Sequence, residues 1–162
     1  LCDSMELFIL GREYARLVEG DHLHAQVVPR VAHGEAFESL TWTGEQEMKA
    51  DCVGLALMLA AAAERGASLA WAFWAADAFV ASFGMLERST WLLGNPSRSA
   101  LIGTPPTASE ARRQLLREMV RQWSGGAEAV AFADSLQPVL DYLENQLQMH
   151  LVNAKFGPVP VH

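Results

Sequence analysis

Apolar residues recur along most of the chain at intervals of three and four positions, which is the period of an α-helix. The first such segment runs from Ser4, the expected N-cap, to about Gly20, which is expected to end it. Its apolar positions fall on one face: Leu7, Leu10, Tyr14, Leu17 and Val18. The pattern therefore predicts an amphipathic helix at the start of the chain.

Four further helices follow from the same periodicity and from residues that start and stop helices. Capping boxes are expected at Thr43-Gly44-Glu45-Gln46 and at Thr107-Ala108-Ser109-Glu110, each opening a helix. Pro138 marks a kink or a restart in the last helix. The four helices are expected at about 43–66, 67–93, 107–124 and 127–155.

The connections carry few periodic apolar positions. Residues 21–42 form a long connection with a short extended piece at 26–31, which Pro29 would confine to the edge of a sheet. A linker is expected at 94–106. The chain is thus predicted to be mainly α, with about five helices around one core and at most a minor strand, in a single domain spanning residues 1–162.

Two apolar segments allow more than one interpretation. The helix at 67–93 is long enough to cross a membrane, but Asp77 at mid-span and many small residues favour a buried core helix, so no membrane span is expected. Its aromatic residues between 71 and 91 pack in the core or form a partner-binding face. The last helix has a leucine seam, packed within the chain or shared in a dimer: Leu136, Leu140, Leu143, Leu147 and Leu151.

Charge and cysteine usage narrow the class of protein. The 162 residues carry a formal net charge of −7, which excludes a general nucleic-acid-binding surface. A basic stripe in the 107–124 helix forms a solvated face or docks an acidic partner: Arg112, Arg113, Arg117 and Arg121. Cys2 and Cys52 form no CxxC pair, and no secretory signal pattern is present, so a cytoplasmic protein is expected.

Two charged motifs stand out. Arg12-Glu13-Tyr14-Ala15-Arg16 places two arginines one helical turn apart, and Glu47-Met48-Lys49-Ala50-Asp51-Cys52-Val53-Gly54 does the same for two carboxylates on the next helix. Alone, each motif is typical of a solvated helix face. In this order they resemble the active-site helices of gluzincin zinc metallopeptidases, where His-Glu-x-x-His supplies two zinc ligands and the general base. The second helix supplies a glutamate ligand and a supporting aspartate.

The resemblance implies a degenerate, truncated zincin core, with the usual N-terminal sheet missing or reduced. Arg12 and Arg16 stand where the histidine ligands would be, and two guanidiniums carry the same charge as Zn²⁺ with two neutral imidazoles. We expect them to pair with Glu47, Asp51 and Glu13 and to hold the two helices together. A guanidinium cannot activate a water molecule as zinc does, so we expect no bound metal or other cofactor and no hydrolysis by the family mechanism.

Three functions are compatible with such a vestigial metal site. In the first, the chain binds a peptide or small protein and takes part in peptide maturation with a partner protein. In the second, it is a non-hydrolytic peptide-modifying enzyme in which Glu13 is the catalytic acid/base, with Arg12 and Arg16 as electrostatic stabilisers. In the third, it is a structural or regulatory pseudoenzyme, a homodimer or a heterodimer with an active homologue. His22 and His24 are interpreted as exposed loop residues or, less readily, as a metal-binding pair.

Overall fold

The computed structural model describes residues 2–23, 25–32, 35–94 and 108–157, with the segment from 26 to 41 described mainly through its backbone. The described part contains five α-helices, a short 3₁₀ turn η1 (Asp21–Leu23) and two strands. The prediction of a mainly α fold with about five helices around one core is confirmed. The helices are α1 (Cys2–Val18), α2 (Gly44–Glu64), α3 (Leu69–Gly94), α4 (Ala108–Arg121) and α5 (Gly126–Phe156).

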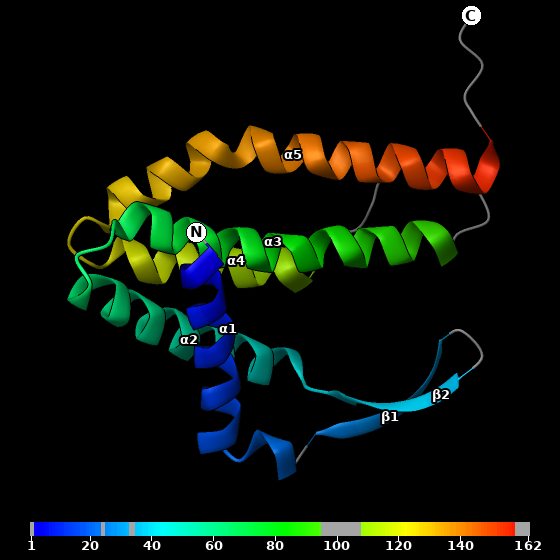
Figure 1. Cartoon of the computed structure of the whole chain (residues 1–162), viewed down its shortest axis with the longest axis horizontal. Helices are drawn as coiled ribbons and strands as arrows, with labels where there is room; N and C mark the ends of the chain where they lie inside the picture. Colours follow the sequence, from blue (N-terminus) through cyan, green and yellow to red (C-terminus); the bar gives the residue numbers. More distant parts are fainter. Residues whose placement is uncertain (1, 24, 33–34, 95–107, 158–162) are drawn as a thin grey trace, which may run out of the picture.

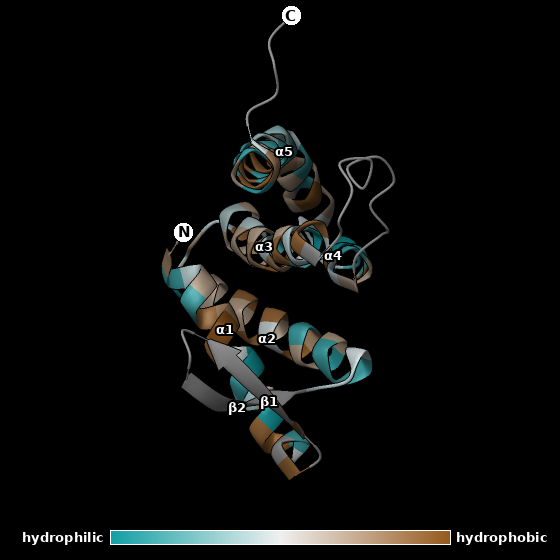
Figure 2. Cartoon of the chain, turned by 90° about the vertical axis from the view of Figure 1, so that its right-hand side faces the viewer, coloured by the Kyte–Doolittle hydropathy of each residue, from teal (hydrophilic) through white to brown (hydrophobic). Residues whose placement is uncertain are grey.

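The helices lie in three tiers. Figure 1 shows α5 running alongside α3, with α4 behind α3, and α1 crossing in front of α2. Seen from the side in Figure 2, α5 forms one tier, α3 and α4 form the middle one, and α1 and α2 form the third. Helix α3 is the central element, because it contacts each of the other four helices.

One hydrophobic core fills the space between the tiers. Phe73 and Val80 of α3 are fully buried in it, together with Phe8 of α1, Leu55 of α2 and Leu116 of α4. Each such side chain contributes about 1.5–3 kcal/mol by leaving water. The core therefore holds together segments that are more than 100 positions apart in the sequence.

The helix boundaries test the expected caps. Thr43 forms the predicted capping box: its side chain accepts a hydrogen bond from the Gln46 backbone, and the Gln46 side chain accepts one from the Thr43 backbone. The prediction of Ser4 as an N-cap is wrong, because α1 already begins at Cys2. Thr107 lies outside the described residues. Helix α5 continues through Pro138 as one helix, so no restart occurs there.

Strands β1 (Gln26–Ala32) and β2 (Glu35–Thr41) form an antiparallel hairpin. The strand expected near 26–31 is therefore present, whereas the second strand lies in a segment expected to be an irregular connection. Pro29 pairs with Glu38 in a two-stranded sheet, where each strand has an outer edge. Figure 1 shows the hairpin extending away from α1 and α2 beneath α3.

Helix α1 turns its apolar stripe away from the core. Its buried residues include Arg12 and Arg16, whereas Leu10, Tyr14 and Leu17 are 65%, 58% and 64% exposed. An amphipathic helix ordinarily packs the apolar face inward. In α1 the inward face is instead built from small residues, one phenylalanine and two arginines.

Helix α3 is long and apolar enough to span a membrane by length and composition, over Leu69–Leu93, and 44% of the apolar 18-residue window within it is buried in the fold. Asp77, near the middle of α3, is fully buried and hydrogen-bonded to arginines of α4. The aromatic side chains of α3 divide between the core and the surface, with Phe73 buried and Trp71 49% exposed. Trp71 contacts Trp74 and Phe132 edge to face.

Candidate functional site

Helices α1 and α2 cross where two glycines face each other. A Cβ atom at Gly11 would lie 2.9 Å from the Gly54 Cα, and one at Gly54 would lie 2.6 Å from Arg12 Cγ. Real Cβ atoms do not come this close to other heavy atoms, so the crossing requires glycine at both positions. The close approach brings Arg12 against Gly54, from where its guanidinium reaches Glu47 and Asp51.

The four residues of the predicted vestigial metal site meet at this crossing. Glu47 bridges both arginines, with Arg12 Nη2 at 2.6 Å from Oε2 and Arg16 Nη2 at 2.5 Å from Oε1. Arg12 Nε lies 2.6 Å from Asp51 Oδ1, an ion pair whose angles are not those of a hydrogen bond. Arg12, Arg16 and Asp51 are buried. The structure therefore brings together the residues that the two motifs singled out.

A fifth member, Arg112 of α4, is not among the predicted site residues. Its Nε donates to Asp51 Oδ2 at 2.6 Å and its Nη2 donates to Oδ1 at 2.9 Å, while Nη2 also lies 3.1 Å from Glu47 Oε2. The signal for it is its position four residues before Leu116 on the buried side of α4. We refer to Arg12, Arg16, Glu47, Asp51 and Arg112 as the arginine–carboxylate cluster.

Aromatic rings line the cluster. The Arg12 guanidinium lies 5.5 Å from the ring centroid of Phe79 and 5.8 Å from that of Phe83, and Arg112 lies 5.6 Å from Phe83. Arg16 stacks at 4.0 Å on Trp42, the residue after β2. Cation–π contacts of this kind stabilise a guanidinium that is shielded from water. The contact between Arg16 and Trp42 also attaches the base of the hairpin to α1.

Burial and charge pairing act in opposite directions on the arginines. Burial, the largest influence, lowers the pKa of Arg12, and Asp51 and Glu47 only partly compensate. For Arg112, burial is again the largest influence and acts to lower the pKa, but the hydrogen bonds to Asp51 and the charges of Asp51, Glu47 and Glu87 together raise the pKa above its ordinary value. Arginine nevertheless stays charged at physiological pH. The guanidinium groups of the cluster therefore keep their positive charge.

Glu13, the predicted catalytic residue, lies at the edge of the cluster. Its side chain is 50% exposed and accepts a hydrogen bond from Arg16 Nη1. Arg16 is therefore shared between Glu13 and Glu47. Among the described residues, no group of three or more histidine, cysteine, aspartate or glutamate side chains is arranged to hold a metal ion. The side chains of His22 and His24 lie outside the described part.

The basic stripe of α4 faces the interior over most of its length. Arg113 and Arg117 each donate two hydrogen bonds to Asp77 of α3. The interpretation as a solvated or docking face is therefore wrong for these two residues and for Arg112, while Arg121 is exposed. Burial acts to raise the pKa of Asp77, but the hydrogen bonds and charges of Arg117 and Arg113 together lower it.

A polar hollow of about 320 Å³ lies between α3, α4 and α5 and includes none of the cluster residues. Arg88 reaches across it, donating to Glu144 of α5 through two nitrogens and to Glu110 of α4. Arg113 also lines it and donates to Gln137 at 2.8 Å. The charged groups of this hollow therefore largely pair with one another and tie the three helices together.

No family model matches the chain, and comparisons with curated proteins and with solved structures likewise found no match. The resemblance to gluzincins therefore rests on the two sequence motifs of α1 and α2.

Proposed function

We propose that this chain is a metal-free, metallopeptidase-like protein that binds a peptide or small protein and takes part in its maturation with a partner protein. The observation that carries the proposal is the meeting of Arg12 and Arg16 with Glu47 and Asp51. In a gluzincin these four positions hold the two histidine ligands, the glutamate ligand and the supporting aspartate.

Electrostatics supports a metal site rebuilt from side chains. Carboxylates removed from water are costly unless cations neutralise them, and two stand one turn apart on α2: Asp51, with a side chain 1% exposed, and Glu47, 20% exposed. Zinc provides that neutralisation in a metallopeptidase. Here three guanidiniums provide it, with planar donors that bind carboxylates through two nitrogens.

The hairpin supports peptide binding. Within the described residues β1 and β2 pair only with each other, so each has an outer edge whose N–H and C=O groups can pair with an extended peptide. Its base is held against α1 by the stacking of Trp42 on Arg16. The hairpin follows α1 in the chain, whereas the sheet of a zincin precedes the motif helix. Any peptide site on it is therefore a new arrangement beside the old metal position.

The geometry favours binding over catalysis at Glu13. An acid/base mechanism needs Arg12 or Arg16 free to stabilise an oxyanion, and both guanidiniums are already engaged by carboxylates. Pairing with an active homologue is the regulatory alternative. A neighbouring gene with an intact His-Glu-x-x-His motif supports that alternative, whereas a short precursor-peptide gene supports maturation.

Restoring the ligands tests the origin of the site. Arg12→His with Arg16→His recreates the zinc motif. Arg112→Gln removes the positive charge that lies 3.1 Å from Glu47 and would repel Zn²⁺. The triple variant is expected to bind stoichiometric zinc by calorimetry, or to gain helicity on zinc addition if it is unfolded without metal. Adding Glu47→Ala should abolish this binding.

The matched control is Arg113→His with Arg117→His, since these arginines also stand one turn apart and face a buried carboxylate, Asp77. Zinc binding by the triple variant that is no tighter than that of this control would contradict the proposal.

Peptide binding is tested with peptides selected from a phage-displayed random library. Selected peptides are synthesised with N-methyl groups at alternate residues, in each of the two phases, and binding is measured by fluorescence anisotropy. Because successive N–H groups of a strand point to opposite edges, methylation in one phase should abolish binding and methylation in the other should preserve it. No selected binder, or equal binding by both methylated forms, would overturn peptide addition to the hairpin.

A further inference from the structure

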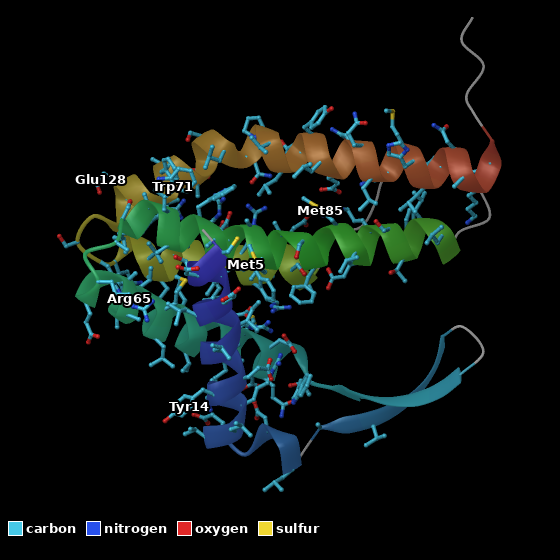
Figure 3. All side chains as sticks on the ribbon, viewed as in Figure 1. Met5, Tyr14, Arg65, Trp71, Met85 and Glu128 are labelled. Carbon is cyan, nitrogen blue, oxygen red and sulfur yellow. The ribbon has the colours of Figure 1, made fainter. Side chains whose placement is uncertain are left out.

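The outer face of α1 carries a regular apolar seam. Leu10, Tyr14 and Leu17 are well exposed, and half-buried Leu7 continues the same line towards the N-terminus. Their spacing of three, four and three residues is the spacing of the a and d positions of a coiled coil. Val18, 64% exposed, lies beside the last turn of the seam. Figure 3 shows Tyr14 on the lower half of α1, at the outside of the molecule.

The seam is acidic at its margins. Glu6 and Glu13 stand seven residues apart along one flank, and Asp3 lies in line with Leu10 and Leu17. All three carboxylates are exposed, and Glu13 is 50% exposed while it accepts a hydrogen bond from Arg16. The two basic residues of α1, Arg12 and Arg16, are only 3% and 7% exposed and lie on the buried side of the helix. The outer face of α1 therefore presents leucines and carboxylates without an exposed cation of its own helix.

We propose that this face docks a basic amphipathic helix of another protein or peptide. Leucine or similar side chains of the partner would fill the spaces between Leu10, Tyr14 and Leu17, and its lysines or arginines would face Glu6 and Glu13. This inference goes beyond the proposed function and does not depend on it, because the seam lies on the opposite side of α1 from the arginine–carboxylate cluster.

The charges on α1 favour a basic partner helix over a second copy of the chain or an anionic membrane. A second copy of the chain would bring another acidic α1 face, with no exposed basic residue of that helix to oppose Glu6 and Glu13. An anionic membrane surface would be repelled by the same carboxylates, since helices that lie on membranes have basic polar faces. A basic partner helix satisfies both the apolar positions and the charges.

The test uses two synthetic, fluorescein-labelled helical peptides with leucine at the a and d positions. One has lysine at the flanking positions, and the other has glutamate there. The whole chain is expected to bind the lysine peptide, with affinity that falls as salt is added, and not the glutamate peptide. Equal binding of both peptides, or binding of neither, would overturn the proposal.

Two variants locate the binding to α1. The double variant Leu10→Ser with Leu17→Ser should lower the affinity for the lysine peptide by at least about tenfold, because two apolar contacts are lost. Both side chains are exposed, so the fold should be retained, as circular dichroism would verify. The control Leu143→Ser, on the exposed side of α5, should leave the affinity unchanged. Equal affinity of the double variant and the control would contradict the assignment.

Charge reversal gives an independent signature. Glu6→Lys should lower the affinity for the lysine peptide and create binding of the glutamate peptide. Loss of structure could not produce this change of preference. Sedimentation of the chain alone tests the second copy: dimers that dissociate on Leu10→Ser with Leu17→Ser would overturn the proposal in favour of self-association. The helical probe and the extended, N-methylated probes differ in backbone conformation, so failure of one proposal is distinguishable from failure of the other.

Discussion

Arg112 of α4 binds Asp51 of α2 through two parallel hydrogen bonds, Nε to Oδ2 at 2.6 Å and Nη2 to Oδ1 at 2.9 Å. Asp51 also faces Arg12 of α1. A single carboxylate, 1% exposed, thus joins three helices from two tiers of the fold. Its removal is the most direct way to ask what the cluster contributes to stability.

Asp51→Ala is expected to lower the free energy of unfolding by about 3–5 kcal/mol, because it leaves Arg12 and Arg112 buried with too few partners. Urea denaturation followed by circular dichroism measures the change. Asp134→Ala is the control, since it removes a carboxylate from an ion pair of Arg117 but is 55% exposed, and should cost at most about 1 kcal/mol. Similar losses for both variants would show that burial of the cluster has little energetic consequence.

Gly54→Ala is expected to destabilise the protein by about 1–3 kcal/mol, because the new Cβ would lie 2.6 Å from Arg12 Cγ and 3.0 Å from the Phe8 carbonyl oxygen. In an open helix position the same change is favourable by up to about 1 kcal/mol. At Gly44, at the start of α2, a Cβ atom would meet no other atom within 4 Å. Gly44→Ala should therefore be neutral or stabilising in the same denaturation experiment.

Acid should remove the contribution that ionised Asp77 makes to the free energy of unfolding. Its pKa is lowered in the folded protein, so its ionised form stabilises the fold above the ordinary pKa of 3.8, and this contribution is lost as the pH falls from that value through the lowered one. The free energy of unfolding of the wild type, measured between neutral pH and pH about 2, should fall more steeply below 3.8 than that of Asp77→Asn. Asp141→Asn, exposed on α5, should keep the steep acid dependence of the wild type.

Glu13→Gln should change stability by at most about 1 kcal/mol, because Glu13 is half-exposed and makes a single pair with Arg16. Binding of the selected extended peptides should also be preserved. Turnover of such a peptide by the wild type that disappears in Glu13→Gln, with binding intact, would replace the binding function with the catalytic alternative. Mass spectrometry of the peptide after incubation gives the readout.

The helices are predictable because their periodicity and caps are local. Thr43 starts α2 through bonds to a residue three positions away, and no tertiary contact is needed for it. Strand β2 is not predictable in this way, because its apolar residues, Phe37 and Leu40 among them, do not alternate. It forms through pairing with β1, which local sequence does not encode.

The candidate site is predictable in part. The order of the two motifs indicates that Arg12, Arg16, Glu47 and Asp51 meet, as the distances bear out. Arg112 escapes prediction because a charge on a helix is ordinarily on its solvated side. Asp77 carries a further signal, since a carboxylate inside an apolar helix needs a cation from elsewhere in the chain, here Arg113 and Arg117.

The orientation of α1 could be predicted neither from its apolar periodicity nor from the order of the two charged motifs. Its apolar positions favour the opposite face, whereas the glycine crossing, buried Phe8 and the carboxylate partners of the two arginines on α2 select the observed one. A stripe of leucines is therefore insufficient to identify the core side of a helix when its other side carries cations matched to buried carboxylates.

The crossing of α1 over α2 also has a defined register. A slide of α1 by one turn, about 5.4 Å, would bring one of the two arginines to the place of the other, so that only one of them could still reach Glu47 and Asp51. The same slide would replace Gly11 at the contact with a residue one turn away, Leu7 or Ala15, whose Cβ has no room against Gly54. The glycine contact and the ion pairs thus permit one alignment and penalise its neighbours. The cluster and the glycine contact together therefore fix the position of α1 along α2.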